Sequence, residues 1–393
     1  VVAQELLSPR IGALDVQPGR AGVSFKGKKW RTGYAACYWS RAAIKILALL
    51  ADGDLPPDEM AGDSIYEFTR NAANWPDLLK KGQTLHVRSH VWDCTNLSNS
   101  QLVERRVRDA VCDVVRDARG ERPAPPSGID FEDLPLQVTV YRDHIQLYRN
   151  LSGMSLHRRG FKKIVHKAAL NESAAAGILY LAGWDKLVEE TLDSSTGPVL
   201  VDPMCGSGTF LVEAAMMARA VPPGSLRESW VFQRWPDYDR EQFDSIQFEA
   251  DEITRQAKRK WKGQIRGNEI HPTALRLAHL AANRSKQRDT IKFHEGPCGL
   301  WIPDRKPDIV VVNPPWGERL TESEGYRVEG SWVELGNFLR QKCQGATAYV
   351  LSGNSENTRH LGMRASRKFP LVIGGVQCRL LKYDVHDDHG GQS

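Results

Sequence analysis

The feature that most constrains the fold is a glycine-rich turn between an apolar run and a helical run. The apolar run Pro198–Val201 predicts a buried strand, and Leu211–Ala218 predicts a helix. Between them stands Asp-Pro-Met-Cys-Gly-Ser-Gly-Thr-Phe at 202–210. Gly206 and Gly208 have no Cβ, so a ligand could lie against the backbone at a helix N-terminus. The pattern predicts a doubly wound α/β sheet with a ligand at this turn.

The residues of the turn favour a cationic ligand over a phosphate. No Gly-Lys-Ser/Thr follows, and the Gly-x-Gly-x-x-Gly spacing is incomplete. Asp202 ends the strand, where a carboxylate suits the cationic amino acid end of S-adenosylmethionine. The expected cofactor contacts in this segment are Asp202, Met204, Cys205, Gly206, Gly208 and Thr209. For Cys205, a packing role is the simpler interpretation.

A second strand and helix follow the turn. Gln264–Glu269 predicts a strand and His271–Asn283 a helix with apolar residues at helical spacing. An acid at the end of the second strand of such a fold accepts hydrogen bonds from a ribose. We therefore expect Glu269 to contact the cofactor, although a solvated glutamate would show the same pattern.

The most specific motif is Asn313-Pro314-Pro315-Trp316, after the β-branched run Asp308–Val312. Two prolines cannot continue a central strand, so the chain must leave the sheet there, and they fix the backbone. The Asn313 amide and the Pro314 carbonyl could grip the two N–H groups of an exocyclic amine and favour a pyramidal transition state. Trp316 offers a face on which a flipped base could stack. Asn313, Pro314 and Trp316 are the expected catalytic residues, and Asn313 also a cofactor contact.

Taken together, these motifs resemble the THUMP-domain, class I S-adenosylmethionine-dependent RNA methyltransferases, closest to the guanine-N2 methyltransferases of bacterial large-subunit ribosomal RNA. Leu156–Phe161, Ala168–Ala176 and the motifs at 202–210 and 313–320 carry the resemblance. It implies a Rossmann-like methyltransferase domain preceded by an α+β THUMP-type RNA-binding domain. Pro297 stands where such enzymes usually have an acid for the adenine, so either Glu295 replaces it or backbone atoms hold the adenine.

The resemblance and the local patterns divide the chain into four parts. These are a THUMP-containing RNA-binding domain at 1–150, a basic connector and first helix at 151–180, the methyltransferase domain at 181–385, and a polar tail at 386–393. The chain opens at Val1, and the first strand expected of the amino-terminal domain is missing or truncated. Expected elements of that domain are helices at Ser40–Leu50 and Gln101–Asp117 and strands at Thr84–Ser89, Leu136–Val140 and His144–Tyr148.

Basic residues gather in two runs. The connector carries the candidate RNA contacts Arg158, Arg159, Lys162 and Lys163 with no acid nearby. A second run lies between Arg255 and Arg266, for which phosphate contact and a solvated helix face are equal interpretations. Trp230 and Trp235, in an insertion after the first helix of the methyltransferase domain, are expected to pack, with substrate contact as an alternative.

Composition limits the remaining classes. With 393 residues, 41% of them hydrophobic and 26% charged, the chain can bury two cores, and its net charge of +5 names no partner by itself. No apolar run reaches the roughly 20 residues of a membrane span. The seven cysteines stand singly, which predicts neither a zinc site nor a disulfide framework. We expect a cytoplasmic protein, or a chloroplast or mitochondrial one if a transit peptide has been removed.

The function expected from the sequence is methyl transfer from S-adenosylmethionine to the exocyclic N2 of a guanine in structured RNA, with large-subunit ribosomal RNA as the expected partner and no metal. Alternatives are a transfer RNA guanine-N2, a protein glutamine-N5 and a DNA adenine-N6 methyltransferase, because an amide or adenine amine presents the same two donors. A different class is an RNA-binding ribosome-assembly factor without catalysis.

Overall fold

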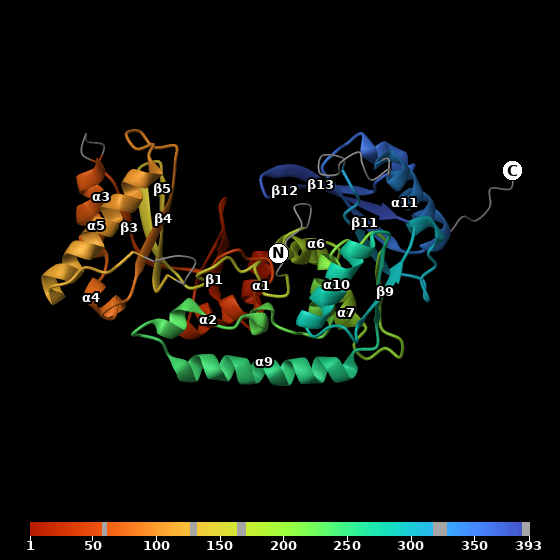
Figure 1. Cartoon of the computed structure of the whole chain (residues 1–393), viewed down its shortest axis with the longest axis horizontal. Coiled ribbons are helices and arrows are strands. Elements are labelled where there is room, and N and C mark those ends of the chain that lie inside the picture. The colour runs from red at the N-terminus through yellow and green to blue at the C-terminus, as the bar shows by residue number, and fades with distance from the viewer. Residues whose placement is uncertain (57–60, 126–131, 163–169, 317–327, 387–393) are drawn as a thin grey trace. The chain divides into compact units, whose positions relative to one another are not determined.

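The computed structural model describes residues 1–56, 61–125, 132–162, 170–316 and 328–386 (Figure 1). The chain forms two compact units. The amino-terminal unit comprises Ala3–Leu156 and Arg227–Gln247, and the carboxyl-terminal unit comprises Val1–Val2, His157–Leu226 and Phe248–Ser393. Each unit therefore takes residues from two or more stretches of chain.

A seven-stranded sheet forms the centre of the carboxyl-terminal unit, in the order β12-β13-β11-β10-β7-β8-β9. Its strands are β7 (Val199–Asp202), β8 (Gln264–Glu269), β9 (Ile291–Glu295), β10 (Ile309–Val312), β11 (Thr347–Ser352), β12 (Arg367–Ile373) and β13 (Val376–Asp384). The five strands β7 to β11 pair in parallel, whereas β13 runs antiparallel to β11 and β12. The expected Rossmann-like α/β fold is confirmed, and so are the strands expected at the glycine turn, at Glu269 and before Asn313.

Both faces of the central strands β7, β10 and β11 are buried, which explains their continuous apolar sequences. In β10, Ile309 and Val311 join a core cluster with Leu211, while Val310 and Val312 join a second cluster with Trp332. The helices of the unit are α6 (Glu172–Leu181), α7 (Trp184–Glu190), α8 (Thr209–Ala218), α10 (Pro272–Arg284) and α11 (Val328–Lys342), with 3₁₀ turns η1 (Pro223–Leu226), η3 (Cys298–Leu300) and η5 (Asn357–Leu361). Burial on both faces leaves the strand ends as the place for a ligand.

The amino-terminal unit contains a four-stranded sheet in the order β3-β6-β5-β4 and a separate β1–β2 hairpin. Its strands are β1 (Leu14–Pro18), β2 (Val23–Lys26), β3 (Leu47–Asp54), β4 (Leu85–Trp92), β5 (Leu134–Tyr141) and β6 (His144–Asn150), and its helices are α1 (Val2–Leu7), α2 (Lys29–Trp39), α3 (Ala61–Ala72), α4 (Trp75–Leu78) and α5 (Ser100–Arg119). Residues of α3 and α5 share one core cluster with β4, β5 and β6. The strands expected at 84–89, 136–140 and 144–148 and the helix at 101–117 are confirmed.

The helix expected at Ser40–Leu50 is wrong. Ser40 ends α2 and begins a turn in which Glu5 accepts hydrogen bonds from the Ser40 hydroxyl at 2.7 Å and the Arg41 N–H at 2.8 Å. Leu47 then enters β3, where it pairs with Asn150 of β6. The leucine- and alanine-rich letters favour a helix locally, but the pairing with a distant strand decides the structure.

The segment Arg227–Gln247 packs into the amino-terminal unit. It includes η2 (Val231–Arg234) and the start of α9 (Arg240–Lys260). Phe232 lies 4.4 Å from Tyr34 between ring centroids, and the Arg149 guanidinium lies 3.4 Å from the centre of the Trp235 ring. Trp235 is 2% exposed, so its side chain packs inside this unit, which is the simpler of the two interpretations given above.

Candidate functional site

The glycine turn (residues 202–209) and the Asn-Pro-Pro-Trp turn (residues 313–316) leave the sheet from neighbouring strands. β7 and β10 pair in parallel, with Leu200 opposite Ile309 and Val201 opposite Val310. The chain builds β8 and β9 on one side of β7 and then returns to place β10 on the other side. The two turns therefore meet at the point where the strand order reverses, which is where doubly wound sheets bind ligands.

The two glycines of the glycine turn serve different purposes. Gly206 has φ +54°, and a Cβ built on it meets no heavy atom within 4 Å. Gly208 has φ +76°, and a Cβ there would lie 3.0 Å from the Ala278 Cβ on α10. Both positive φ values favour glycine. Gly208 thus allows a helix to approach, whereas Gly206 faces open space that a ligand could occupy.

Two carboxylates lie at the start of this turn. Asp202 is 1% exposed, and its Oδ1 accepts a hydrogen bond from the Met204 N–H at 3.2 Å. Burial raises the pKa of Asp202 well above its usual range, and the charge of Glu269 raises it further. Glu269 accepts from the Gly206 N–H at 2.7 Å and the His271 N–H at 2.9 Å, one bond on each oxygen. Each oxygen keeps a second lone pair, so Glu269 can still accept from a ligand.

Other residues expected to contact a cofactor take varied positions. Cys205 is buried in the core, and burial raises the pKa of its thiol well above the usual range, so the thiol stays neutral. Thr209 is buried at the first position of α8, and Met204 is half-buried. Glu295 is exposed at the end of β9, opposite Glu269 in the register. Glu295 and Met204 are thus accessible at the strand ends, whereas the Cys205 side chain belongs to the packing.

The second half of the Asn-Pro-Pro-Trp turn is held by hydrogen bonds, whereas its first residue has an oxygen without a hydrogen-bond partner among the described residues. Trp332 donates its indole N–H to the Pro315 carbonyl at 2.9 Å, and Trp316 donates to the Leu351 carbonyl at 3.2 Å. In contrast, the Oδ1 of Asn313 is buried and has no hydrogen-bond partner among the described residues. Buried acceptors are nearly always satisfied, so this oxygen at a strand end is available to a donor from a ligand.

Trp316 is anchored on one side. A Cβ built on Gly353 would lie 2.5 Å from the indole ring, so only glycine allows this close contact. The side chain of Asn357 also donates to the Trp316 carbonyl at 3.2 Å. Gly353 and Asn357 were absent from the sequence-based site, because nothing in their own segments indicates that Trp316 lies against them.

The basic connector requires a correction. Arg159 is buried and its Nε lies 3.1 Å from Glu213, which is also buried. The side chain of Lys162 is 5% exposed and donates to the Leu170 carbonyl at 2.9 Å, with Glu172 at 3.8 Å. Burial lowers the pKa of Lys162, while the Glu172 charge opposes this shift. Both cations neutralise buried acids and are unavailable to a phosphate. Arg158 is exposed, and Lys163 lies outside the described residues.

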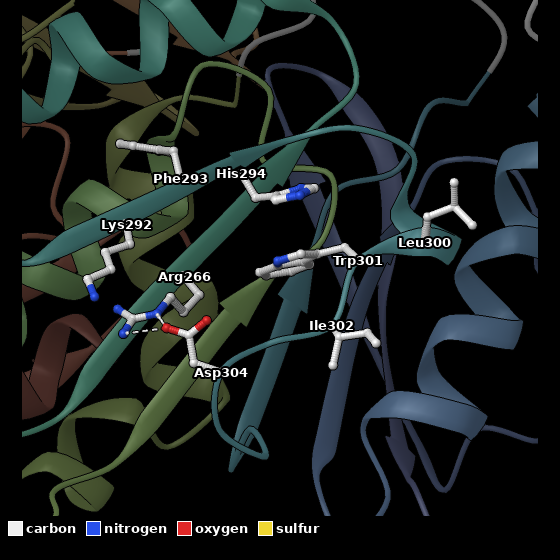
Figure 2. Close-up of a pocket in the computed structure, with 8 residues that line it drawn as sticks. All are labelled: Arg266, Lys292, Phe293, His294, Leu300, Trp301, Ile302 and Asp304. Atoms are coloured by element: carbon white, nitrogen blue, oxygen red, sulfur yellow. Dashed lines mark hydrogen bonds and ion pairs between the residues drawn. The ribbon is translucent and has the colours of Figure 1, made fainter.

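A pocket of about 340 Å³ lies beside the edge strand β9 (Figure 2). Its lining residues are Arg266, Lys292, Phe293, His294, Leu300, Trp301, Ile302 and Asp304. Arg266, the last cation of the second basic run, is buried and paired with Asp304 at 3.3 Å. No residue of the glycine turn or the Asn-Pro-Pro-Trp turn lines this pocket, so it is separate from the candidate site.

Asn268 is a site residue that sequence reasoning missed. It stands next to Glu269 on β8, is 1% exposed, and donates to carbonyl groups in the turns after β7 and β9. An asparagine directly before Glu269 at the end of a strand was the available signal, but its partners lie in the turns after other strands.

Among the described residues, no group of three or more His, Cys, Asp or Glu side chains is arranged for a metal ion. All seven cysteines are free. No helix within the described part of the chain is long and apolar enough to cross a membrane.

Known proteins are similar to this chain in sequence and in fold. Ribosomal RNA large subunit methyltransferase K/L of Allochromatium vinosum is 32% identical over 98% of this chain, and the protein of the same name from Syntrophotalea carbinolica is 34% identical over 98%. The chain covers 50% and 52% of these relatives, about half their length. A Synechocystis protein with the provisional name of an RNA methyltransferase is 29% identical over 98% of this chain and 94% of its own.

Solved structures with a similar fold and models of protein families also match this chain. A Clostridium difficile protein titled a possible methylase has TM-score 0.80 at 22% identity, covering 100% of this chain and 96% of its own. TrmN of Thermus thermophilus has TM-score 0.65 at 19% identity, with 98% and 95% covered. An RlmL ferredoxin-like domain matches residues 1–47, and an RMKL-like methyltransferase domain matches residues 159–382, more than half of the chain. The protein therefore belongs to the RMKL-like methyltransferase domain family.

Proposed function

We propose that this protein transfers a methyl group from S-adenosylmethionine to the exocyclic N2 of a guanine in structured RNA, specifically in large-subunit ribosomal RNA. The observation that carries the proposal is the buried, unpartnered Oδ1 of Asn313 on the strand beside the glycine turn. Family membership supports methyl transfer, and the names of the K/L relatives support the choice of RNA.

The glycine turn fits S-adenosylmethionine in space and charge. The open space at Gly206 admits a ligand against the backbone. Glu269 supplies an acceptor for a ligand, and a cationic ligand beside Asp202 would oppose the shift in its pKa and favour its charged form. The spare lone pairs of Glu269 suit ribose hydroxyls. When bound, the cofactor supplies an electrophilic methyl group on a sulfonium. Exposed Glu295 would meet the adenine end, in place of the acid that Pro297 displaces.

The Asn-Pro-Pro-Trp turn fits a planar amine. The lone pair of the guanine amine is delocalised into the ring, so the amine must become pyramidal to attack a methyl group. Asn313 Oδ1 and the Pro314 carbonyl would accept its two N–H groups and bind more strongly as charge develops, which lowers the barrier. Trp316, fixed by Leu351 and Gly353, would present its remaining surface to the flipped base. The amine loses its proton after methylation, so a weak acceptor suffices.

RNA docking is proposed for the amino-terminal unit, as a THUMP-type module at 1–150 joined through 151–180 to the methyltransferase domain at 181–385. Its match to an RlmL ferredoxin-like domain at residues 1–47 supports an origin in an RNA-modifying enzyme. Within the connector, Arg158 is the described cation that remains exposed for a phosphate.

The test incubates the full chain and labelled S-adenosylmethionine with ribosomal RNA and transfer RNA, followed by mass spectrometry of nucleosides. We expect N2-methylguanosine in large-subunit RNA, and far less of it with Asn313→Ala after the same incubation time. Label in N6-methyladenosine or in protein glutamine would overturn the choice of acceptor. Label in transfer RNA alone would overturn the choice of RNA, and failure of the chain to bind the cofactor would overturn the enzyme class.

A further inference from the structure

The side chain of Asn268 uses its hydrogen-bonding capacity in a single buried arrangement. Its Nδ2 donates to the Pro203 carbonyl at 3.0 Å and to the Gly296 carbonyl at 2.9 Å. Its Oδ1 lies 2.7 Å from Nδ1 of His294. The backbone carbonyl of the same residue accepts from the Cys205 N–H at 2.9 Å. An asparagine amide has two N–H donors, and both are used here.

These bonds join three consecutive strand ends. Pro203 belongs to the glycine turn after β7, and Gly296 begins the turn after β9, while Asn268 lies on β8 between them. The Gly296 N–H also donates to the Glu269 carbonyl at 3.1 Å. A side chain on the middle strand can reach both flanking turns at once, so this one amide links the two turns in addition to the backbone bonds.

The orientation of the amide is fixed from a third side. If the amide were flipped, its oxygen would face two carbonyl oxygens, which repel it. His294 reinforces the observed orientation because its Nδ1–H can donate to Oδ1. The imidazole stacks on Trp301 with centroids 6.1 Å apart and an interplanar angle of 19°, so its own ring is positioned (Figure 2).

We propose that Asn268 is the positioning residue of the cofactor site, and that His294 keeps its amide in the working orientation. This rests on the proposed function, because the glycine turn is taken to bind S-adenosylmethionine. Asn268 holds the Pro203 carbonyl at a fixed position relative to the turn after β9, on the side proposed for the adenine. It thereby also fixes the path of the chain from Pro203 toward Gly206. It also fixes Gly296, which stands between Glu295 and Pro297 on the side proposed for the adenine.

The test measures the affinity of the full chain for S-adenosylhomocysteine by calorimetry. Asn268→Ala should weaken binding by about ten- to a hundredfold, the range for buried acceptors that lose their donor. RNA affinity should change less than about twofold, because the amide contacts only the turns. Lys292→Ala is the matched control, since Lys292 lies exposed on β9 in the pocket of Figure 2 and touches neither turn.

A pH profile separates positioning from a general structural role. In Asn268→Asp, one oxygen of the new carboxylate faces two carbonyl oxygens, which raises its pKa, and the His294 Nδ1 at the other oxygen opposes this shift only in part. A protonated carboxyl can donate one of the two lost bonds, so the affinity of this variant should recover as pH falls, whereas the parent shows no such recovery. A merely structural defect would not restore affinity with acid.

His294→Phe keeps the ring on Trp301 and removes only the donor, so it does not depend on whether the Asn268 variants fold. We expect several-fold weaker cofactor binding with an unchanged unfolding temperature. If the parent binds S-adenosylhomocysteine while folded Asn268→Ala and His294→Phe bind equally well, the positioning role is refuted. If the parent itself does not bind, the proposed function fails instead.

Discussion

At the scale of single residues, the site is defined by polar atoms that the protein itself leaves unsatisfied or poorly solvated. Asn313 Oδ1 has no partner among the described residues, and Asp202 is buried as an acid beside another acid. Such arrangements reduce the stability of the protein without ligand and are retained where a ligand repays them. Substitutions at these residues should therefore affect ligand binding, the chemical step and the stability of the protein to different extents.

Asn313→Ala should lower the single-turnover rate of methyl transfer by about 10²–10³, as loss of one aligned donor or acceptor does at other preorganised sites. RNA and cofactor dissociation constants should stay within a few fold. Trp316→Ala should instead weaken RNA capture by roughly 1–3 kcal/mol through lost stacking. Trp316→Phe is the control that keeps a ring and removes only the bond to Leu351. If Asn313→Ala transfers the methyl group at the parental rate with both ligands saturating, this turn has only a structural role.

Gly206→Val should abolish cofactor binding, because its side chain would fill the open space at the turn. Its positive φ also strains any L-residue, at roughly 1–2 kcal/mol. Gly82→Val is the matched control, because Gly82 has φ +77° and open space but lies in the amino-terminal unit. Calorimetry on both folded variants decides the matter. Equal affinity for Gly206→Val and parent would mean that the cofactor lies elsewhere.

Asp202→Asn should stabilise the ligand-free protein and weaken cofactor binding. Because the folded pKa of Asp202 is raised, its contribution to stability is complete below about pH 4 and is lost as pH rises through the folded pKa. At pH 7 we expect the variant to gain about 0.5–2 kcal/mol, as substitutions that relieve functional strain often do. Denaturant unfolding from pH 4 to 8 measures it, with exposed Asp193→Asn as control. A stability that does not depend on this substitution at any pH would contradict the argument.

At the scale of secondary-structure elements, the sequence predicts what depends on neighbours along the chain. The strands β7, β8 and β10 and the turns that follow them were predicted because hydrophobic patterns and glycine or proline positions are local. The segment Ser40–Leu50 was not, because its conformation depends on Glu5 and on pairing with β6. The roles of Arg159, Lys162 and Asn268 were missed for the same reason, because their partners approach them only in the folded protein. These partners are Glu213, Glu172, Pro203 and Gly296.

The connector provides a test of this distinction. Arg159→Ala should destabilise the protein by about 3–5 kcal/mol, because it removes the cation that lies 3.1 Å from the buried Glu213. Replacing both residues by Met should recover most of that loss. Arg158→Ala should leave stability unchanged and reduce the salt slope of RNA binding by about 0.7–0.9 if it contacts one phosphate. Chemical unfolding and a salt titration measure the two effects, and an unchanged slope would mean that Arg158 is only solvated.

At the scale of the whole molecule, the amino-terminal unit is built from two separate stretches of chain. Asp237 pairs with the buried Arg149 at 2.8 Å, and Trp235 covers the same guanidinium. A fragment of residues 3–156 should therefore unfold at lower temperature than the same fragment joined by a flexible linker to 227–247. Calorimetry on the two fragments compares them, and Asp237→Ala in the longer one should remove part of the gain. Equal unfolding temperatures would show that the second stretch adds nothing to this unit.

Because the amino-terminal unit consists of two separate stretches of chain, its parts become available at different times during synthesis. The amino-terminal unit cannot acquire the aromatic partners that residues 227–247 supply to Tyr34 and Arg149 until that stretch has left the ribosome, after β7 and the glycine turn have already been made. At roughly 5–20 residues per second, the interval between Leu156 and Arg227 lasts several seconds. During that time a buried arginine and several rings lack their cover, so this unit is the part of the nascent chain that most needs protection from aggregation.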